Sequence, residues 1–230
     1  MPIEFLLIDL DDTILDFHKA EHIVLEKTLR LFGIDPSDDI RTRYSQINLA
    51  HWQMLERGEL TRQEVAVGRF ACLFRELNVI ADAQLASDTY AHHLSIGHYF
   101  LPGAETALEQ LSGKYKLYLA SNGTATTQES RLKSANIGHY FKDIFISQHL
   151  GADKPSPEFF RRAFARIPGF DPSRAMIVGD SLTSDIKGGN NAGIATCWVN
   201  PKHLSHPADI QVDHEIESLS QLEKLLDNLI

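Results

Sequence analysis

The sequence predicts an α/β fold, a doubly wound, Rossmann-like parallel sheet with an all-helical domain inserted into it. Two observations support this prediction. Short apolar runs that favour buried strands alternate with stretches that favour helices over much of the chain. Residues 17–98 interrupt the alternation, because they show helical periodicity and no clear strand pattern. We therefore assign residues 1–16 and 99–230 to the core domain and residues 17–98 to the inserted domain.

Five apolar runs rich in β-branched and aromatic residues are the predicted strands. In chain order, they span residues 3–8, 116–120, 143–147, 175–178 and 195–199. Polar or glycine-rich residues follow each of the first four runs directly. Ligands of a doubly wound sheet bind beyond the carboxyl ends of its strands. We therefore expect these polar clusters to meet at one edge of the sheet.

The predicted helices are marked by periodicity and by capping patterns. Residues 20–32 place their apolar side chains on one helical face, and Gly33 provides a stop. The segment Thr61-Arg62-Gln63-Glu64 has the pattern of a capping box that begins a second helix. A third apolar stretch runs from Leu85 to Leu94. Residues 218–229 combine another capping box with an amphipathic closing helix of the core domain.

The composition excludes several classes of partner. The 230 residues include 22 basic and 31 acidic side chains, so the net charge of −9 offers no basic surface for a nucleic-acid polymer or an anionic membrane. No apolar run approaches the roughly 18 residues of a membrane span. Cys72 and Cys197 are far apart, which predicts buried free thiols and a reducing compartment. Without a signal-like start, we expect a cytoplasmic protein that is a monomer or a weak dimer.

Three acidic side chains, Asp9, Asp11 and Asp12, come directly after the first predicted strand. Like charges this close repel one another unless a cation binds. In an extended segment, residues i and i+2 point the same way, so Asp9 and Asp11 can address one site. Such a pair can divide a reaction between a nucleophile and a general acid or base. A solvated acidic turn is the structural alternative.

Three further polar clusters follow later predicted strands. Asp180 and Asp185 add carboxylates suited to Mg²⁺, and Ser121-Asn122-Gly123 offers a hydroxyl and backbone N–H groups for phosphate oxygens. Lys154 can neutralise both carboxylates and a phosphoryl group. Taken singly, each cluster also suits a helix cap or an exposed charge. Their succession, each after a predicted strand, favours a catalytic site for an anionic ligand.

These motifs resemble, in type and order, the four motifs of the haloacid dehalogenase superfamily of phosphohydrolases. Asp9, Asp11 and Thr13 match an Asp-x-Asp-x-Thr motif, and the remaining motifs are matched by Ser121, Lys154 and the pair Asp180 and Asp185. The resemblance covers the whole chain. The insertion lies where subclass I members of the superfamily carry a helical cap.

The resemblance implies a two-step phosphoryl transfer from a phosphate monoester. Asp9 would attack phosphorus and form an aspartyl-phosphate, while Asp11 would protonate the leaving oxygen and then deprotonate the hydrolytic water. It also implies Mg²⁺ as the cofactor, held by the Asp9 carboxylate, the Asp11 backbone carbonyl and Asp180. Asp185 would contact the metal through water.

The same resemblance assigns the remaining core residues to the phosphate. Ser121 and the backbone of Asn122 and Gly123 would bind phosphoryl oxygens, with Asp12 in the same substrate-binding set. Lys154 would offset the charge on Asp9 and the phosphate. Family members that cleave carbon–halogen bonds lack the second aspartate, so the presence of Asp11 points to phosphate chemistry.

Within the superfamily, the chain resembles the bacterial pyrimidine 5′-nucleotidases. The resemblance includes Trp52 and Gly58-Glu59-Leu60-Thr61 in the cap and residues 188–193 in the core. A cap turn supplies leaving-group contacts in subclass I, so Arg57 or Arg62 is a candidate to reach a ribose or base, and Trp52 is a candidate to stack on a base. The resemblance thus implies Mg²⁺-dependent hydrolysis of nucleoside 5′-monophosphates.

Other functions remain compatible with these residues. A sugar-phosphate phosphatase or mutase and a phosphoglycolate-type phosphatase would use the same core motifs, and a mutase would rephosphorylate its product. A non-catalytic binding module on the same fold is a further alternative, although every catalytic motif is intact. A tryptophan on an amphipathic helix more often packs in the core, which is the structural alternative for Trp52.

Overall fold

A computed structural model describes residues 2–229 and divides the chain into two compact units. The core unit comprises the chain up to Phe17 together with the chain from His98 onward, and the helical unit spans His18–Gly97. Within the described residues, no helix combines the length and the apolar character that crossing a membrane requires.

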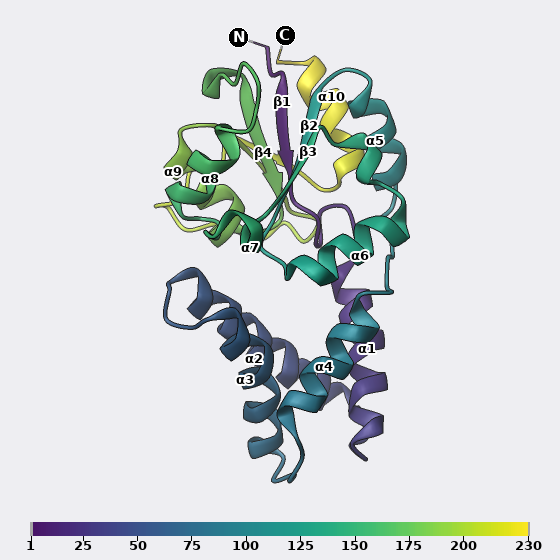
Figure 1. Ribbon diagram of the computed structural model, residues 1–230. Coiled ribbons are helices and arrows are strands. Elements are labelled where there is room, and N and C mark those ends of the chain that lie inside the picture. The colour runs from purple at the N-terminus through teal and green to yellow at the C-terminus, as the bar shows by residue number, and fades with distance from the viewer. Residues whose placement is uncertain (1, 230) are drawn as a thin grey trace. The chain divides into compact units, whose positions relative to one another are not determined.

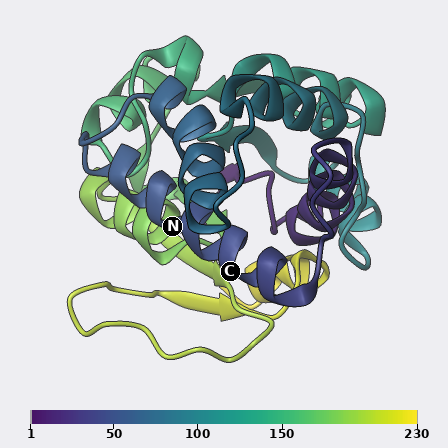
Figure 2. The same ribbon diagram turned by 90° about the horizontal axis from the view of Figure 1, so that it is seen from below.

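The core unit is built on a six-stranded parallel sheet in the order β3-β2-β1-β4-β5-β6 (Figure 1). The strands are β1 Phe5–Ile8, β2 Lys116–Ser121, β3 Asp143–Ile146, β4 Ala175–Gly179, β5 Ala195–Val199 and β6 His214–Ile216. The parallel order confirms the predicted doubly wound fold. Strand β6 was not among the five predicted strands. It follows a long loop, residues 200–213, that extends from the end of β5 (Figure 2).

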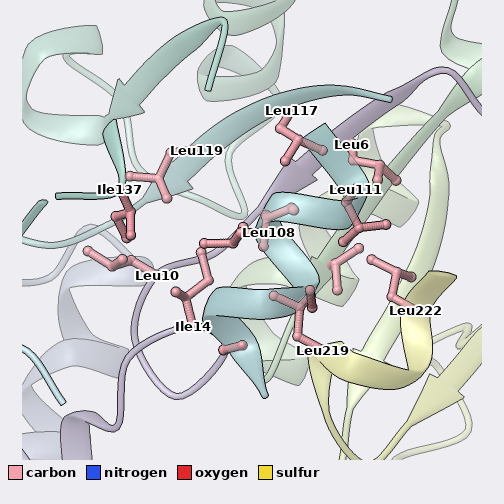
Figure 3. Close-up of a cluster of buried hydrophobic side chains, with 14 of the residues drawn as sticks. Leu6, Leu10, Ile14, Leu108, Leu111, Leu117, Leu119, Ile137, Leu219 and Leu222 are labelled. Atoms are coloured by element: carbon pink, nitrogen blue, oxygen red, sulfur yellow. The ribbon is translucent and has the colours of Figure 1, made fainter. Parts of the chain in front are cut away.

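Strand β1 occupies the centre of the sheet because its four side chains are fully buried, two on each face. Leu6 and Ile8 join the cluster under helices α5, α6 and α10, part of which Figure 3 shows. Phe5 and Leu7 join the opposite cluster, under α8. The register pairs Ile8 with Leu119 of β2 and with Val178 of β4. The three strands therefore end side by side, and the residues that follow them meet.

Helices cover both faces of the sheet (Figure 1). The helices of the core unit are α5 Ala104–Ser112, α6 Ala125–Ala135, α7 Ser147–Leu150, α8 Pro157–Phe164, α9 Lys187–Ala192 and α10 Leu222–Asp227. Four short helical turns lie between them, η1 Gly138–Tyr140, η2 Pro172–Arg174, η3 Leu182–Ile186 and η4 Leu219–Gln221. The Ser218 side chain makes no capping hydrogen bond at η4, so the second predicted capping box is wrong. Instead, Gln221 accepts from the backbone N–H of Glu217 at 2.9 Å.

The helical unit contains helices α1 Phe17–Leu31, α2 Asp38–Glu56, α3 Arg62–Glu76 and α4 Ala83–Leu94, the first of which begins at the last residue of the core unit. Gly33 adopts φ +71°, which suits the predicted stop after α1. The capping box of Thr61 and Glu64 is confirmed. Leu85 is 55% exposed, so it does not share the buried face of Tyr90 and Leu94.

Both cysteines are free thiols. Cys197 is buried within β5, as predicted. Cys72 is only half-buried, because it lies on the polar side of α3, where Arg75 donates to its Sγ at 3.4 Å and Glu76 lies 3.7 Å from it. The prediction of two buried thiols is therefore right for one of them.

A short antiparallel joint closes the core unit where the chain leaves and re-enters it. Leu15 and Phe100 form an antiparallel bridge. On either side of it, the Asp16 N–H donates to the Tyr99 carbonyl at 2.7 Å and the Leu101 N–H donates to the Ile14 carbonyl at 3.0 Å. Residues 14–16 and 99–101 are thus tied to each other within the core.

Candidate active site

The loop after β1 fixes the first acidic cluster. The N–H of Asp9 still donates to the Val178 carbonyl at 2.9 Å, so Asp9 continues the line of β1. The N–H groups of Ile14 and Leu15 then return to the Leu10 carbonyl, at 3.0 and 2.9 Å, and all three of these side chains are fully buried. This closed turn leaves the Asp9 and Asp11 carboxylates at the carboxyl end of the sheet.

Asp12 has a local role in the same turn. Its backbone is left-handed, with φ 53°, and its N–H donates to the Leu15 carbonyl at 2.7 Å. Its carboxylate accepts a hydrogen bond of 2.9 Å from the Phe17 N–H at the start of α1. Acidic groups are favourable at a helix N-terminus. A contact of Asp12 with phosphate stays a prediction.

Lys154 is the cation at the centre of the site, and its side chain is 1% exposed. Its Nζ donates to Asp9 Oδ1 at 2.6 Å, to Asp185 Oδ1 at 2.6 Å and to the Ala120 carbonyl at 2.5 Å. Burial lowers the pKa of Lys154, but Asp185 and Asp9 outweigh it, so the pKa lies above its ordinary value. The ammonium group therefore stays charged between the two carboxylates.

Three carboxylates form a group that could hold a metal ion. Oxygens of Asp9, Asp180 and Asp185 all lie within 4.8 Å of one another. Burial raises the pKa of Asp9 despite the opposing effect of Lys154, and burial together with the neighbouring acids raises that of Asp180 well above its ordinary value. A divalent cation would oppose these shifts, since it favours the ionised carboxylates. Hard oxygen donors in this arrangement fit Mg²⁺.

Groups around the end of β4 hold two of these acids in place. The Ser181 N–H donates to Asp185 Oδ2 at 3.1 Å, and the Trp198 indole N–H donates to the Asp180 carbonyl at 2.8 Å. Gly179 leaves the space that Asp185 occupies, because a Cβ there would come within 2.2 Å of Asp185 Oδ2. Asp11 is not part of the carboxylate group, and the proposed role of its backbone carbonyl stays a prediction.

The segment after β2 carries the predicted phosphate-binding residues. Ser121 is buried, and its Oγ accepts from the Gly123 N–H at 3.1 Å. The Asn122 side chain forms two hydrogen bonds with the backbone of Lys154, donating to its carbonyl at 2.8 Å and accepting from its N–H at 2.9 Å. Asn122 therefore holds the segment that carries the buried ammonium group, a role that the sequence did not indicate.

Two residues of α6 belong to the site and were not predicted. Arg131 forms an ion pair with Asp11 through its Nη1, and Gln128 donates to Asp11 Oδ2 at 2.7 Å. They lie three residues apart, and therefore on one helical face, in the helix that follows the β2 turn. A Gln and an Arg one turn apart are also typical of a solvent-facing helix, so the sequence alone did not mark them as site residues.

The family model of haloacid dehalogenase-like hydrolases matches residues 3–193, which is well over half of the chain. The chain belongs to the haloacid dehalogenase-like hydrolases. The family resemblance inferred from the four motifs is therefore confirmed, and the protein is an enzyme of the phosphohydrolase type.

Relatives of this hydrolase align over nearly its full length. It is 36% identical over 228 residues to the pyrimidine 5′-nucleotidase PynA of Streptococcus pneumoniae, and this alignment covers 99% of this chain and 96% of that protein. It is 30% identical over 226 residues to the pyrimidine 5′-nucleotidase YjjG of Escherichia coli, with 97% of both chains covered. The magnesium-bound crystal structure of the HAD-hydrolase YfnB of Bacillus subtilis matches with a TM-score of 0.94 and 38% identity, covering 99% of this chain and 100% of that one.

The candidate leaving-group residues of the hydrolase lie in the helical unit. Trp52 is half-buried on α2. Arg57 follows the end of α2 and is exposed, with its guanidinium paired to Glu59 at 2.6 Å across Gly58, whose φ is +73°. The Arg57–Glu59 ion pair thus holds this turn in one conformation with the Arg57 side chain exposed. Contacts of Trp52 and Arg57 with substrate stay predictions.

Proposed function

We propose that this hydrolase is a Mg²⁺-dependent phosphatase of nucleoside 5′-monophosphates, with a preference for pyrimidine nucleotides. The observation that supports phosphatase chemistry best is the buried Lys154 ammonium group between Asp9 and Asp185, beside a second aspartate at position 11. The two relatives named as pyrimidine 5′-nucleotidases support the choice of substrate.

Asp9 is the proposed nucleophile. Its carboxylate oxygen forms a bond to phosphorus as the bond to the ester oxygen breaks, and Asp11 donates a proton to that oxygen. The product alcohol leaves, and Asp9 carries the phosphoryl group. Asp11 then takes a proton from water as the water oxygen attacks phosphorus, which restores Asp9 and releases inorganic phosphate.

Charge stabilisation is the proposed task of the residues around Asp9. Lys154 offsets negative charge on Asp9 and on the phosphoryl oxygens, and Ser121 and the backbone of Asn122 and Gly123 bind these oxygens. Asp9 and Asp180, with Asp185 nearby, would hold Mg²⁺. When bound, the metal supplies positive charge that stabilises the anionic phosphoryl group.

The helical unit is proposed to be the cap that recognises the leaving group. In this role, Arg57 would contact the ribose or base and Trp52 would stack on the base. The proposed surroundings are a reducing cytoplasm, which suits two free thiols, and the proposed assembly is a monomer or a weak dimer.

The deciding experiment is phosphate release from a panel of UMP, dUMP, dTMP, purine monophosphates, phosphoglycolate and sugar phosphates, with and without Mg²⁺. We expect release only with Mg²⁺, with the highest kcat/KM for a pyrimidine nucleotide. Equal or better turnover of phosphoglycolate or a sugar phosphate would contradict the proposal. Disappearance of a sugar phosphate without stoichiometric release of phosphate would indicate a mutase. The Asp9→Asn variant is the control for background hydrolysis.

A pair of arginine variants tests the proposed cap contact. Arg57→Met should raise KM for UMP and leave hydrolysis of p-nitrophenyl phosphate unchanged, because the aryl ester has no ribose or base. Arg43→Met is the matched control, since Arg43 forms a similarly exposed ion pair with Glu76 in the same unit. An unchanged KM for UMP in Arg57→Met would remove Arg57 from the substrate contacts.

A further inference from the structure

We propose that Arg131 and Gln128 are positioning residues that orient the Asp11 carboxylate for proton transfer and link it to Ser121. This proposal rests on the phosphatase function proposed above. Arg131 contacts Asp11 Oδ1 through its Nη1, and Gln128 Nε2 donates to Asp11 Oδ2 at 2.7 Å. Each oxygen of the carboxylate therefore has its own donor, and both donors come from α6.

The burial of Arg131 makes the ion pair strong and directional. Its side chain is 1% exposed, whereas that of Asp11 is 28% exposed. Leaving a buried guanidinium group without an anion is strongly unfavourable. Asp11 supplies that anion, so the carboxylate is held toward the interior side of the loop while its outer surface remains accessible.

Gln128 is oriented by Arg131 and in turn orients two site residues. Its Oε1 accepts from Arg131 Nη1 at 3.0 Å, so its Nε2 faces Asp11. The same Nε2 donates to Ser121 Oγ at 2.9 Å. The proposed acid and base and the proposed phosphate-binding hydroxyl thus share one amide group, which couples their positions.

The β2 turn is built to admit this amide. A Cβ at Gly123 would come within 2.4 Å of Gln128 Nε2, so the glycine leaves the space in which the amide lies. Gln128 is 1% exposed and fills that space. The turn after β2, with Gly123, and helix α6, with Gln128, are therefore packed directly against each other.

This arrangement is compatible with proton transfer. A carboxylate has about four lone-pair sites, and the two donors leave a second lone pair on each oxygen. Asp11 can therefore bind and release a proton while its plane is fixed. Because proton transfer depends steeply on orientation, loss of the two donors should slow the steps that use Asp11 more than the steps that do not.

Substrates with different leaving groups separate these steps. The alkoxide of a nucleoside 5′-monophosphate needs a proton from Asp11 as it leaves, whereas p-nitrophenolate leaves without one. Hydrolysis of the aspartyl-phosphate needs Asp11 as a base with either substrate. A misplaced Asp11 should therefore slow both steps for UMP and only the second step for p-nitrophenyl phosphate.

The test compares Arg131→Met, Arg131→Lys and Gln128→Met with the wild type by rapid-mixing and steady-state kinetics. For Arg131→Met we expect kcat on UMP to fall about 10²-fold with little change in KM. With p-nitrophenyl phosphate we expect a burst of about one p-nitrophenolate per active site, followed by slow turnover. Gln128→Met, which removes no charge, should show the same burst with a smaller loss, and Arg131→Lys should recover part of the UMP rate.

Arg166→Met is the matched control, because Arg166 forms a half-exposed ion pair with Asp143 in the same unit and its guanidinium lies 5.3 Å from the Phe145 ring. Its kinetics should equal those of the wild type. The proposal would be overturned if the folded Gln128→Met and Arg131→Lys variants lost kcat equally on both substrates and showed no burst. It would also be overturned if neither variant lost any activity. A wild-type protein that releases phosphate from neither substrate would instead contradict the phosphatase function itself, and the positioning role with it.

Discussion

Lys154 and Asp9 lie 145 residues apart in the chain, yet Nζ of Lys154 donates a hydrogen bond of 2.6 Å to Oδ1 of Asp9. The same ammonium group lies 2.6 Å from Asp185. Asp9 directly follows β1, whereas Asp185 lies in η3, the helical turn after the neighbouring strand β4. The two carboxylates would repel each other without the lysine. Lys154 is therefore a structural counter-ion of the acidic group as well as a proposed part of the chemistry.

Replacing Lys154 by methionine should separate these two roles. We expect Lys154→Met to lose phosphatase activity. Without Mg²⁺, its free energy of unfolding should also fall by about 3–5 kcal/mol, because the buried Asp9 and Asp185 carboxylates lose their counter-ion. Added Mg²⁺ should raise Tm more in the variant than in the wild type, since the cation replaces the missing positive charge. Thermal unfolding with and without MgCl₂ measures both effects.

Lys116→Met is the control for this experiment. Lys116 forms a half-exposed ion pair with Glu4 at 2.5 Å, and such pairs contribute about 0–1 kcal/mol. A Tm response to Mg²⁺ in Lys154→Met no larger than that of the wild type would contradict the role of Lys154 as a counter-ion.

Gly179→Ala should damage the acidic group by steric contact alone. The added methyl group would lie 2.2 Å from Asp185 Oδ2, and Asp185 is buried with Lys154 and Ser181 against it. We expect a loss of about 1–3 kcal/mol in unfolding free energy and weaker Mg²⁺ binding in calorimetric titration. Gly138→Ala is the control, because nothing lies within 4 Å of its added Cβ. Equal Mg²⁺ affinity in both variants would show that the Asp185 position is not set by Gly179.

Glu21 predicts a pH dependence of stability in the helical unit. Burial raises the pKa of Glu21, although Ser45, Arg69, His18 and Asn48 act in the opposite direction. The folded state therefore binds a proton more tightly than the unfolded state does, and its stability falls as pH rises from the unfolded pKa through the raised folded pKa. Glu21→Gln mimics the protonated form. Its unfolding free energy should exceed that of the wild type at pH 7, and the difference should shrink toward pH 4.

Urea titrations at several pH values measure this effect. Glu64→Gln is the control, because its free energy of unfolding should change in the opposite direction. The Thr61 N–H and hydroxyl lower the pKa of Glu64 in the capping box. The stability that this carboxylate adds is present above its unfolded pKa and is lost as pH falls, so Glu64→Gln should be less stable than the wild type at neutral pH. The prediction for Glu21 fails if Glu21→Gln is also less stable than the wild type at pH 7.

The two thiols should differ in reactivity. Burial raises the pKa of Cys197 to about 12, so the reactive thiolate is scarce as well as inaccessible. Cys72 is half-buried beside Arg75. Titration of the native protein with a chromogenic disulfide reagent should therefore label one thiol rapidly, and addition of denaturant should expose the second. Rapid labelling in native Cys72→Ser would contradict the burial of Cys197.

The sequence predicted the central sheet, and it placed most of the candidate site residues at one edge of that sheet, because each signal was local. Apolar runs marked β1 to β5, and the site residues Asp9, Ser121 and Asp180 stand at or just beyond strand ends, where the parallel order brings them together. The strand ends were less certain, since the structure begins β1 at Phe5 and extends β4 to Gly179. Strand β6 has only three residues, which is too short for a periodic pattern to stand out.

Residues that act through long-range contacts could not be identified in this way. Arg131 and Gln128 have the composition of an ordinary solvent-facing helix, and only packing against the Asp11 loop shows that they are buried. The Asn122 side chain likewise meets the Lys154 backbone across 32 residues. Leu85 shows the reverse case, because it belongs to the third predicted apolar stretch and the structure leaves it exposed.

The antiparallel joint at Leu15 and Phe100 gives the chain a modular construction. The segments on either side of the insertion are hydrogen bonded to each other, so the insertion forms a closed loop on the core. Each doubling of the length of such a loop costs only about 0.6 kcal/mol of folding free energy. We therefore expect that residues 18–97 can be exchanged for a short hairpin or for the equivalent segment of a relative while the sheet still forms. Chimeric proteins that keep this joint would test whether the exchanged segment, as proposed, determines which substrate the enzyme prefers.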